Sequence, residues 1–368
     1  MRTAVTGVEG FLGRHLRVRL KAAGIHEVVP ISRRTFSEPE LLRAALVGVD
    51  AVVHLAGINR DTDVAVELGN LALAEELVAA LDDVGAAPVL VYANSIQAGS
   101  DSPYGRGKAR AAEVLSCWSG KRDVRFVNLV LPNVFGEGGR PNYNSFVATF
   151  CQCLAEGSVP RIEIDRPVEL LHAQDVARMI GESFHGPVEG GVVSVPGHHS
   201  TVGEVFSELE ELSGTYATGS LPDLSSPFRL RLFNTYRSYL FPDWYPRALD
   251  EKADERGSFV EVVRAFGGQG QTSFSTTKPG VTRGNHFHLH KVERFVVVKG
   301  SARIAVRPVA GGEVRRFDVT GDEPVFIDIP TLHTHNISNT GTSELLTLFW
   351  ASEIFDPADP DTYSEPVE

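Results

Sequence analysis

The sequence predicts two fold classes in one chain: a doubly wound α/β domain with a small lobe over residues 1–245, and an all-β barrel over residues 246–368. Three observations lead to this division. Short apolar runs alternate with helical patterns up to about residue 130, and a glycine-rich turn follows the first run. From about residue 254 the chain changes to short β-rich segments broken by Gly, Pro and Asn. Alternating strands and helices are typical of a parallel sheet, and successive short strands are typical of a barrel or sandwich.

The first half has apolar segments that we expect to be strands, at residues 3–5, 28–31, 51–55, 89–93 and 124–129. Helical periodicity lies between them, at residues 10–23 and 64–83, which predicts helices on the faces of a parallel sheet. Residues 131–245 are less regular, with one marked helix that starts at a capping box of Thr201 and Glu204. We expect this stretch to be a small lobe that closes over a ligand.

The second half begins after a Pro- and aromatic-rich stretch, residues 241–246, that we interpret as a linker. Sustained helical periodicity is absent beyond it. The segments that we expect to be strands are residues 295–298, 302–306, 325–329 and 345–350.

Composition narrows the class of partner. The formal net charge of −12 argues against nucleic acid or an anionic membrane as the main partner. The three cysteines, Cys117, Cys151 and Cys153, do not form a disulfide framework and fit reduced thiols. We see no signal peptide and no apolar run of membrane-spanning length. We therefore expect a cytoplasmic protein that acts on a small molecule.

The glycine-rich turn, Thr6 to Gly13, is typical of a Rossmann-type dinucleotide site. Gly7 allows the tight turn, Gly10 lets the backbone approach a pyrophosphate, and Gly13 lets the helix pack on the sheet. The helix that starts at this turn offers N–H groups and positive potential to the phosphates, at Phe11 and Leu12 among others.

The end of the second strand normally distinguishes NAD from NADP. An acidic residue there would bind the ribose 2′-hydroxyl, but this chain has Arg33 and Arg34. Two guanidinium groups suit a 2′-phosphate, so the sequence predicts NADPH as the cofactor. The alternative is that both arginines are solvated surface residues.

A second group of residues predicts carbonyl chemistry beside this cofactor. Tyr104 and Lys108 are one helical turn apart, so both can face one pocket, and a nearby ammonium lowers the pKa of a phenol. Ser95, at the end of the fourth expected strand, lies where it can hydrogen-bond the same carbonyl oxygen. The segment Leu55, Ala56 and Gly57 completes the set.

These motifs resemble those of the extended short-chain dehydrogenase/reductases, and the resemblance covers residues 1 to about 245. It implies that Tyr104 is a general acid, that Lys108 binds the cofactor ribose and tunes Tyr104, and that Ser95 contacts the carbonyl. Only nine positions separate Ser95 from Tyr104, fewer than in many sugar-nucleotide dehydratases and epimerases. This spacing favours a plain reductase.

The β-rich half contains a candidate metal site. His286 and His288 point to the same face if they lie on one strand, and a turn can bring Glu293 back beside them. His335 follows in a second motif downstream. Three histidines and a carboxylate suit Zn²⁺ or a similar divalent ion. Two motifs in this order on β-rich sequence are typical of a cupin barrel.

Residues 254–261 and 283–286 also resemble the sugar-nucleotide 3,5-epimerases of deoxysugar pathways, which are cupins. In that family the histidine that corresponds to His286 is a catalytic base, so His286 has two interpretations here: metal ligand or base. His290 and His333 are further histidines nearby. His290 can share the face by strand alternation, although a solvated loop position is the simpler interpretation.

Over nearly its full length the chain resembles bifunctional capsular polysaccharide enzymes that join such a reductase to a C-terminal cupin. The resemblance implies a UDP-4-keto-6-deoxy-N-acetylhexosamine substrate, UDP-2-acetamido-2,6-dideoxy-4-ketohexose. The cupin would epimerise C3, and the reductase would then reduce C4 to UDP-N-acetyl-6-deoxy-talosamine, a precursor of N-acetylfucosamine. It also implies a homodimer.

Polar residues after the fifth expected strand are candidates for contacts to the UDP-sugar: Asn133, Arg140, Asn142, Tyr143, Asn144 and Arg166. Each is equally well explained as a structural loop residue. Two rival functions stay open: a reductase that carries a structural or regulatory metal-binding cupin, and a metal-dependent dioxygenase fused to a reductase. The segment Arg283 to His286 argues against the dioxygenase.

Overall fold

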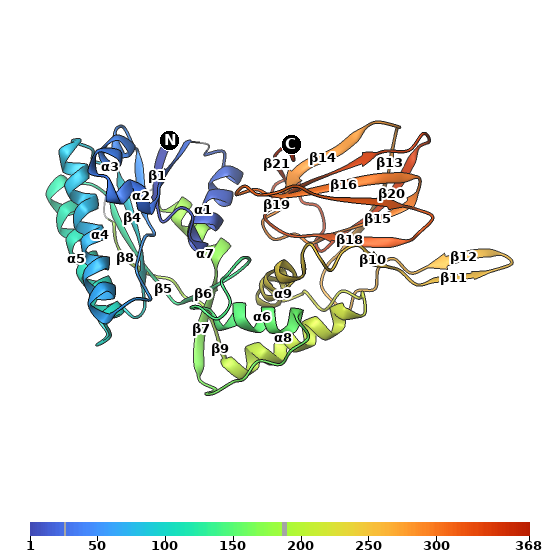
Figure 1. Cartoon of the computed structure of the whole chain (residues 1–368), viewed down its shortest axis with the longest axis horizontal. Coiled ribbons are helices and arrows are strands. Elements are labelled where there is room, and N and C mark those ends of the chain that lie inside the picture. The colour runs from blue at the N-terminus through green and yellow to red at the C-terminus, as the bar shows by residue number, and fades with distance from the viewer. Residues whose placement is uncertain (26, 186–189) are drawn as a thin grey trace. The chain divides into compact units, whose positions relative to one another are not determined.

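The computed structural model describes residues 1–25, 27–185 and 190–368, which form two compact units (Figure 1). Unit 1 comprises Met1–Val134 and Val168–His199, and unit 2 comprises Phe135–Pro167 and Ser200–Glu368. Residues 200–245 thus share a unit with the β-rich half. The boundary that we expect between residues 245 and 246 separates two functional domains, whereas these units are defined by compactness. It therefore stays a prediction.

Unit 1 is built on a parallel six-stranded sheet, which confirms the doubly wound α/β prediction. Its first five strands in chain order match the five expected segments. In sheet order the strands are β2 (Glu27–Ile31), β1 (Arg2–Thr6), β3 (Ala51–His54), β4 (Val89–Ser95), β5 (Phe126–Leu131) and β8 (Gly191–Ser194).

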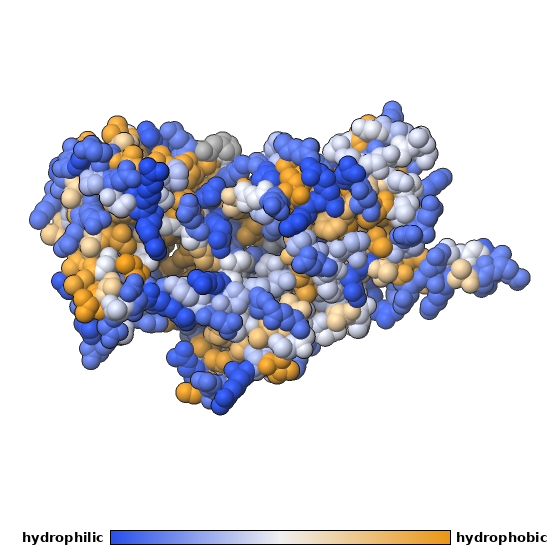
Figure 2. All heavy atoms as spheres, in the orientation of Figure 1, coloured by the Kyte–Doolittle hydropathy of each residue, from blue (hydrophilic) through white to orange (hydrophobic). Residues whose placement is uncertain are grey.

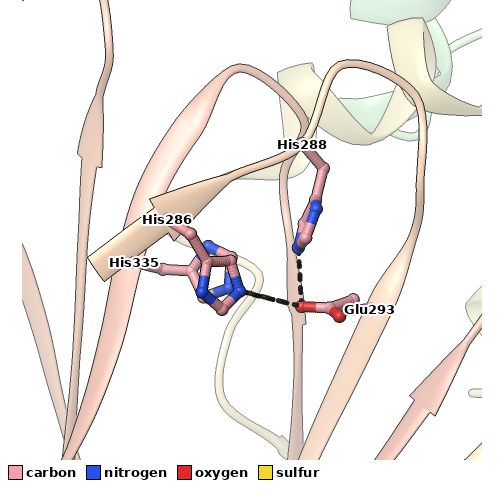
Figure 3. A group of neighbouring side chains, drawn as sticks. All are labelled: His286, His288, Glu293 and His335. Carbon is pink, nitrogen blue, oxygen red and sulfur yellow. Dashed lines mark hydrogen bonds and ion pairs between the residues drawn. The ribbon is translucent and has the colours of Figure 1, made fainter. Parts of the chain in front are cut away.

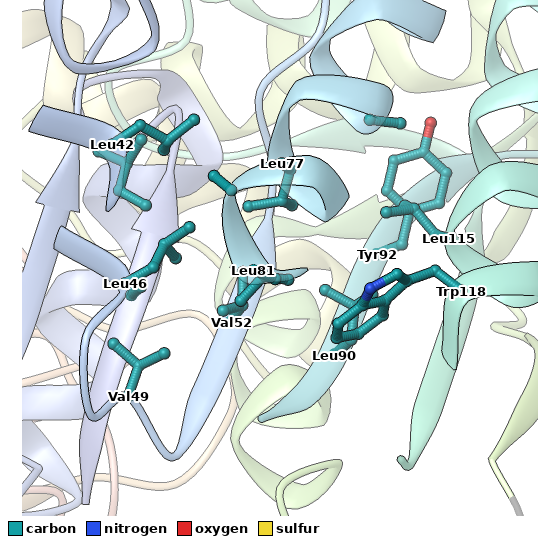
Figure 4. Packing of buried hydrophobic residues seen from close by; sticks show 14 of the residues in the cluster. Leu42, Leu46, Val49, Val52, Leu77, Leu81, Leu90, Tyr92, Leu115 and Trp118 are labelled. Carbon is teal, nitrogen blue, oxygen red and sulfur yellow. The ribbon is translucent and has the colours of Figure 1, made fainter. Parts of the chain in front are cut away.

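Helices cover both faces of this sheet because successive strand residues point to opposite sides. Val52 and Leu90 face a core with α3 (Pro39–Leu46), α4 (Asp63–Asp83) and α5 (Pro103–Arg122), part of which Figure 4 shows. Val53 and Val91 face the other core, with α1 (Phe11–Ala22) and α7 (Ala173–Glu182). A short helix, α2 (Arg33–Ser37), follows β2.

The strand order places the carboxyl ends of β1 and β3 at a switch point. The chain leaves β1 toward β2 on one side and leaves β3 toward β4 on the other side. Loops that depart in opposite directions open a crevice at this edge, which is where α/β sheets bind their ligands.

Unit 2 contains two antiparallel five-stranded sheets that share one hydrophobic core, which confirms the all-β expectation; the closed barrel stays a prediction. One sheet comprises β10 (Arg247–Ala248), β18 (Val325–Ile329), β15 (Glu293–Lys299), β20 (Leu345–Ala351) and β13 (Gln271–Thr277). The other comprises β17 (Arg315–Thr320), β16 (Ser301–Pro308), β19 (His333–Asn339), β14 (Thr282–Phe287) and β21 (Tyr363–Ser364). A hairpin of β11 (Glu251–Asp254) and β12 (Gly257–Val260) carries a largely hydrophilic surface (Figure 2).

Residues 131–245 are more regular than predicted. They contain α6 (Phe146–Ala155), α7, α8 (Val202–Ala217) and α9 (Pro227–Leu240), and α8 starts at the expected capping box. The prediction missed α6 and α9 because their aromatic residues blur the helical period. All three chain crossings between the units fall within one small sheet of β6 (Asn133–Phe135), β7 (Pro167–His172) and β9 (His198–Thr201).

The interpretation of residues 241–246 as a linker is wrong. Tyr245 is buried in the core of unit 2, and Phe241 and Trp244 pack against that core. A sequence of aromatic residues and prolines is compatible with either a packed segment or an exposed linker. The burial of these side chains shows that this segment is packed. None of the helices in the described ranges is both long and apolar enough to cross a membrane.

A buried ion pair joins the lobe helices to the sheets of unit 2. The Arg294 guanidinium donates to both carboxylate oxygens of Asp328, at 2.7 and 2.9 Å, and both side chains are almost fully buried. The Tyr216 hydroxyl on α8 donates to the same carboxylate at 2.6 Å and contacts the Tyr245 hydroxyl at 2.5 Å. The remaining Arg294 nitrogen donates to the Gly219 carbonyl at 2.8 Å.

We expect Asp328→Asn to destabilise unit 2 strongly, because it leaves the Arg294 charge buried without its partner. Loss of one member of a buried pair costs about 3–5 kcal/mol, which should lower the urea midpoint followed by tryptophan fluorescence. The exposed pair Arg303–Asp318 is also a cross-strand, two-contact pair, so Asp318→Asn is a matched control that should have little effect. Equal midpoint shifts in the two variants would contradict this assignment.

Candidate functional site

The glycine loop of unit 1 has the close packing that its sequence predicts. Gly7 has a φ of +65°, and a Cβ there would lie 2.9 Å from the Ala56 amide nitrogen. A Cβ on Gly13 would lie 2.4 Å from the Gly7 carbonyl oxygen. The Gly10 amide donates to that same carbonyl at 2.9 Å. Only glycine fits these positions, so the loop and the Leu55–Gly57 turn lie directly against each other.

Thr6 joins these two segments, a role that sequence reasoning missed. Its hydroxyl accepts from the Leu55 and Ala56 amides, each at 3.0 Å, and hydrogen-bonds His54 at 2.9 Å. Burial, assisted by the charge of Lys108, lowers the pKa of His54 to about 3, so its imidazole is neutral. In the sequence, this link is indicated only by the position of Thr6 at the end of one strand and of the Leu55–Gly57 turn at the end of another.

The N-terminus of α1 has the uncapped backbone N–H groups that an anionic ligand requires. Gly10 is the N-cap, no side chain caps it, and no acidic residue lies in the first turn, which begins at Phe11 and Leu12. The first backbone N–H groups of a helix carry partial positive charge. This arrangement fits the pyrophosphate of a dinucleotide.

Ser95, Tyr104 and Lys108 come together where β4 ends and α5 begins. Burial raises the pKa of Tyr104, while a hydrogen bond to Ser95 opposes that rise. The Lys108 ammonium donates to the Ala93 carbonyl at 2.6 Å and lies 4.0 Å above the Tyr92 ring. Burial lowers the pKa of Lys108 to about 7. A protonated phenol beside a serine hydroxyl is suited to donate a proton to a carbonyl oxygen.

The two arginines after β2 differ in their surroundings. Arg34 forms an exposed ion pair with Glu38 at 3.0 Å, four residues along the chain. Arg33 is exposed at the start of α2, whose N-cap is Ser32. Of the two, Arg33 is therefore the better candidate to meet a 2′-phosphate.

The candidate substrate residues fall on separate segments. Arg140 and Tyr143 belong to one turn before α6, with the guanidinium 5.0 Å from the ring centre, and the exposed Asn142 and Asn144 lie in the same turn. Asn133 belongs to unit 1, where its amide donates to the Glu169 carbonyl at 3.1 Å. Arg166 is exposed and immediately precedes β7, in unit 2.

The four predicted metal-ligating residues converge in unit 2 (Figure 3). One ligand atom from each of His286, His288, Glu293 and His335 lies within 4.8 Å of the others. The Glu293 carboxylate oxygen is 2.8 Å from His288 Nε2, 3.3 Å from His335 Nε2 and 3.9 Å from His286 Nε2. Burial would raise the pKa of Glu293, but the three imidazoles outweigh it and hold that pKa well below its usual range.

The outer ring nitrogens show why this donor set fits a divalent cation. His288 Nδ1 lies 2.5 Å from the Asp361 carbonyl oxygen, and His335 Nδ1 lies 3.4 Å from the His333 carbonyl oxygen. A carbonyl oxygen only accepts, so these contacts place a proton on Nδ1 and leave Nε2 as the ring atom that faces Glu293 and can ligate a cation. His335 Nε2 is buried and has no hydrogen bond of good geometry, as expected for an atom arranged to bind a metal.

A bulge that the sequence analysis missed sets the direction of His286. The register of β14 against β19 shifts between Gly284 and His286, and the intervening Asn285 has a φ of +61°. A Cβ at Gly284 would lie 2.9 Å from the His335 carbonyl oxygen. His286, with 27% of its side chain exposed, is the ligand most open to solvent, whereas His288 and His335 are buried. Bulges redirect side chains in this way.

Neither further histidine joins the four-residue cluster. His290 Nδ1 lies 3.3 Å from Glu353 and 3.4 Å from Asp361. His333 Nδ1 contacts the Thr331 carbonyl at 2.8 Å, and its ring packs against Phe241. The alternation of β14 ends at Phe287, so His290 does not share the face of His286.

Two protein families match separate parts of the chain. Residues 3–185 match the NAD dependent epimerase/dehydratase family, and residues 252–363 match the polysaccharide biosynthesis C-terminal domain. The chain is thus an epimerase/dehydratase-type protein fused to that second domain. A UDP-N-acetylglucosamine 4-epimerase from Bacillus cereus, at 23% identity and a TM-score of 0.53, covers 58% of this chain and 82% of its own; it shows the fold alone.

Full-length relatives define the family. The UDP-2-acetamido-2,6-beta-L-arabino-hexul-4-ose reductase of Pseudomonas aeruginosa is 36% identical and covers 99% of this chain and 98% of its own. The crystal structure of the capsular polysaccharide assembling protein CapF from Staphylococcus aureus is 34% identical, with a TM-score of 0.65 and 100% of both chains covered. The chain belongs to the CapF family.

We expect the stability of unit 1 to depend on pH through Lys108. Its pKa is about 7 in the folded chain but about 10.4 when unfolded. Between these values the unfolded state binds more protons, so folding becomes more favourable as pH rises through this window. Lys108→Met removes the buried charge and should be more stable than the wild type near pH 6.5 by on the order of a few kcal/mol.

This gain should shrink by pH 9.5, because the wild-type lysine is then largely neutral in the folded state. Urea unfolding at the two pH values measures the difference. Lys121→Met, an exposed position on the same helix, is the control and should give the same small difference at both pH values. A Lys108→Met effect that does not change with pH would refute the assignment.

Proposed function

We propose that this chain is a bifunctional UDP-sugar enzyme in the biosynthesis of a capsular or related surface polysaccharide. Unit 1 supplies an NADPH-dependent reductase site, and the β-rich part of unit 2 forms a cupin barrel with a metal-dependent C3 epimerase site. The substrate is UDP-2-acetamido-2,6-dideoxy-4-ketohexose, and the product is UDP-N-acetyl-6-deoxy-talosamine. The observation that carries the proposal is the convergence of His286, His288, Glu293 and His335 in a chain that also has a Ser–Tyr–Lys reductase site. The CapF and reductase relatives over the full length support it.

In the reductase reaction, Tyr104 protonates the C4 oxygen as hydride arrives at C4. A phenol is protonated at neutral pH, and burial raises the pKa of Tyr104 further, so its hydroxyl is available as a proton donor. Ser95 donates a hydrogen bond to the same oxygen, and Lys108 binds the cofactor ribose and stabilises the phenolate that forms. Gly7, Gly10 and Gly13 let the loop approach the pyrophosphate, and Arg33 recognises the 2′-phosphate.

Epimerisation must precede reduction. The C4 ketone acidifies the C3 proton because the resulting carbanion is delocalised as an enolate. A base removes this proton, and a proton returns on the opposite face. Reduction of C4 removes that acidity, and it also draws an unfavourable epimer equilibrium forward. This order gives a physical reason to couple the two activities in one chain.

The donor set supports His286, His288, Glu293 and His335 as the residues that would hold a divalent cation, with Zn²⁺ the best match. When bound, the cation supplies Lewis-acid stabilisation of enolate charge. His286 is the most exposed of the four and stays a candidate for the proton-transferring base. Its Nε2 is also the farthest of the three from the Glu293 carboxylate, at 3.9 Å.

One observation favours a second function for the β-rich part. His288 and His335 are fully buried beside the core of unit 2, as expected for a structural metal staple. Under this alternative, the chain is an NADPH-dependent UDP-sugar reductase with a structural or regulatory metal-binding cupin. Chelation would then unfold unit 2, and the wild-type protein would show no exchange at C3.

The remaining parts of the proposal concern partners and location. Arg140, Asn142, Tyr143 and Asn144 bind the UDP-sugar, with Asn133 and Arg166 as further contacts. A homodimer fits the 74% exposure of Phe274 on the edge strand β13 and the 65% exposure of Phe259 on the hairpin. A cytoplasmic location would give access to NADPH and UDP-sugars.

The decisive experiment is proton exchange in D₂O without NADPH. NMR of the UDP-4-keto sugar incubated with the zinc-loaded protein should show deuterium at C3. His335→Ala and protein treated with a chelator should lose this exchange, while NADPH binding to unit 1 persists. Chelated protein that stays folded and still exchanges C3 would rule out a metal-dependent epimerase. No exchange with the wild type would leave only the reductase.

Tyr104→Phe should separate the two activities. Removal of the general acid should slow NADPH oxidation by the keto sugar about 10²–10⁴-fold, while C3 deuterium exchange continues. Absorbance at the nicotinamide band measures the first activity and NMR measures the second. NADPH affinity, followed by fluorescence, should stay close to that of the wild type. If reduction keeps its wild-type rate, Tyr104 is not the proton donor.

A further inference from the structure

The residues around Asp361 form a polar anchor beside the metal-ligating cluster that no motif identified. Asp361 is fully buried, and its carboxylate accepts three successive backbone amides. Leu289 donates to one oxygen at 2.9 Å, and His290 and Lys291 donate to the other at 2.9 and 2.8 Å. A carboxylate that accepts three amides fixes the path of the loop that follows His288.

Asp361 also contacts a predicted metal ligand through its own backbone. Its carbonyl oxygen accepts His288 Nδ1–H at 2.5 Å. One residue thus holds the loop with its side chain and sets the tautomer and ring orientation of His288 with its carbonyl. The φ of Asp361 is +38°, which is unfavourable for a residue with a Cβ and persists only where several contacts determine it.

Lys291, in the loop that Asp361 holds, in turn binds the segment that contains Asp361. Its ammonium, almost fully buried, donates to the Pro360 carbonyl at 2.9 Å and to the Thr362 hydroxyl at 3.0 Å. These contacts lie on both sides of Asp361. The loop thus binds residues 360 and 362 through Lys291, and Asp361, which lies between them, binds the loop.

The segment of residues 359–367 continues along the strands of the other two histidine ligands. Ser364 on β21 pairs with His286 on β14, and the Glu365 amide donates to the Asn285 carbonyl at 2.8 Å. The Thr334 hydroxyl, next to His335, donates to the Glu365 carbonyl. Residues 359–367 thus contact His288 and His286 directly and the neighbour of His335 on β19.

We propose that Asp361 is a positioning residue for the metal centre, which it serves by holding the 288–292 loop and the Nδ1–H tautomer of His288. This inference rests on the proposed metal site and adds a residue outside both histidine motifs. Partners that orient a ligating histidine typically change metal affinity by about 10–100-fold when they are removed. Asp361→Asn keeps the size of the side chain but points an amide donor at amide donors.

The test is Co²⁺ and Zn²⁺ binding to the full-length protein. Asp359→Asn is the matched control, because it makes the same charge change on an exposed side chain two residues away. We expect wild type and Asp359→Asn to bind one Co²⁺ with the same visible spectrum. We expect Asp361→Asn to bind Zn²⁺ about 10–100-fold more weakly in competition with a chelator, and to show shifted Co²⁺ bands. NADPH affinity should be equal in all three proteins.

Lys291→Met serves as a second variant in case Asp361→Asn does not fold. It removes the contacts to Pro360 and Thr362 without changing Asp361 or His288, and it should weaken Zn²⁺ binding and shift the Co²⁺ bands in the same direction. Wild-type metal affinity and spectrum in either folded variant would overturn the role of Asp361. A wild-type protein that binds neither ion would overturn the metal site itself, an outcome distinct from an effect of Asp361 alone.

Discussion

The buried pair of Arg294 and Asp328 is the interaction on which the arrangement of unit 2 depends. Side chains alternate along β15, so Glu293 faces the metal-ligating cluster while Arg294 faces the opposite side, toward α8. A buried guanidinium needs hydrogen-bond acceptors for its N–H groups, and here Asp328 on β18 and the Gly219 carbonyl, just after α8, supply them. The strand that carries a predicted metal ligand is therefore fixed by an electrostatic requirement on its other face.

The same unit holds the loop that carries most of the candidate substrate residues. The Thr331 hydroxyl donates to the Glu137 carboxylate at 2.6 Å, and the Tyr239 hydroxyl donates to the Gly139 carbonyl at 2.6 Å. On α9, the Asn234 amide donates to the His290 carbonyl at 2.7 Å, within the 288–292 loop that follows a predicted metal ligand. Segments expected to serve the reductase thus share hydrogen bonds with segments of the proposed epimerase, which is consistent with the proposal that both reactions act on one substrate.

The two candidate sites show contrasting ways to prepare for charge. Unit 1 presents backbone N–H groups at a helix start and a close approach of two glycine-containing turns, so it can receive phosphate without a cluster of buried cations. Unit 2 gathers three imidazoles around one carboxylate, and carbonyl oxygens behind two of them set their protonation. The first site depends on backbone geometry, and the second depends on side chains held by their outer partners.

The sequence by itself determined the parallel sheet, its five leading strands and the glycine loop, because these features follow from local periodicity and from positions that only glycine can occupy. It also identified the four residues that converge in unit 2 and that we propose as metal ligands, since their types and order form a recognisable pattern before they meet. The tertiary structure alone decided what lies behind those residues. Asp361 is 73 residues from His288, and Thr6 is 48 residues from His54, and neither pair has a local pattern. Burial likewise turned residues 241–246 from an expected linker into part of a core. Contacts between distant segments are set by how whole elements pack, and a single sequence records that packing only weakly.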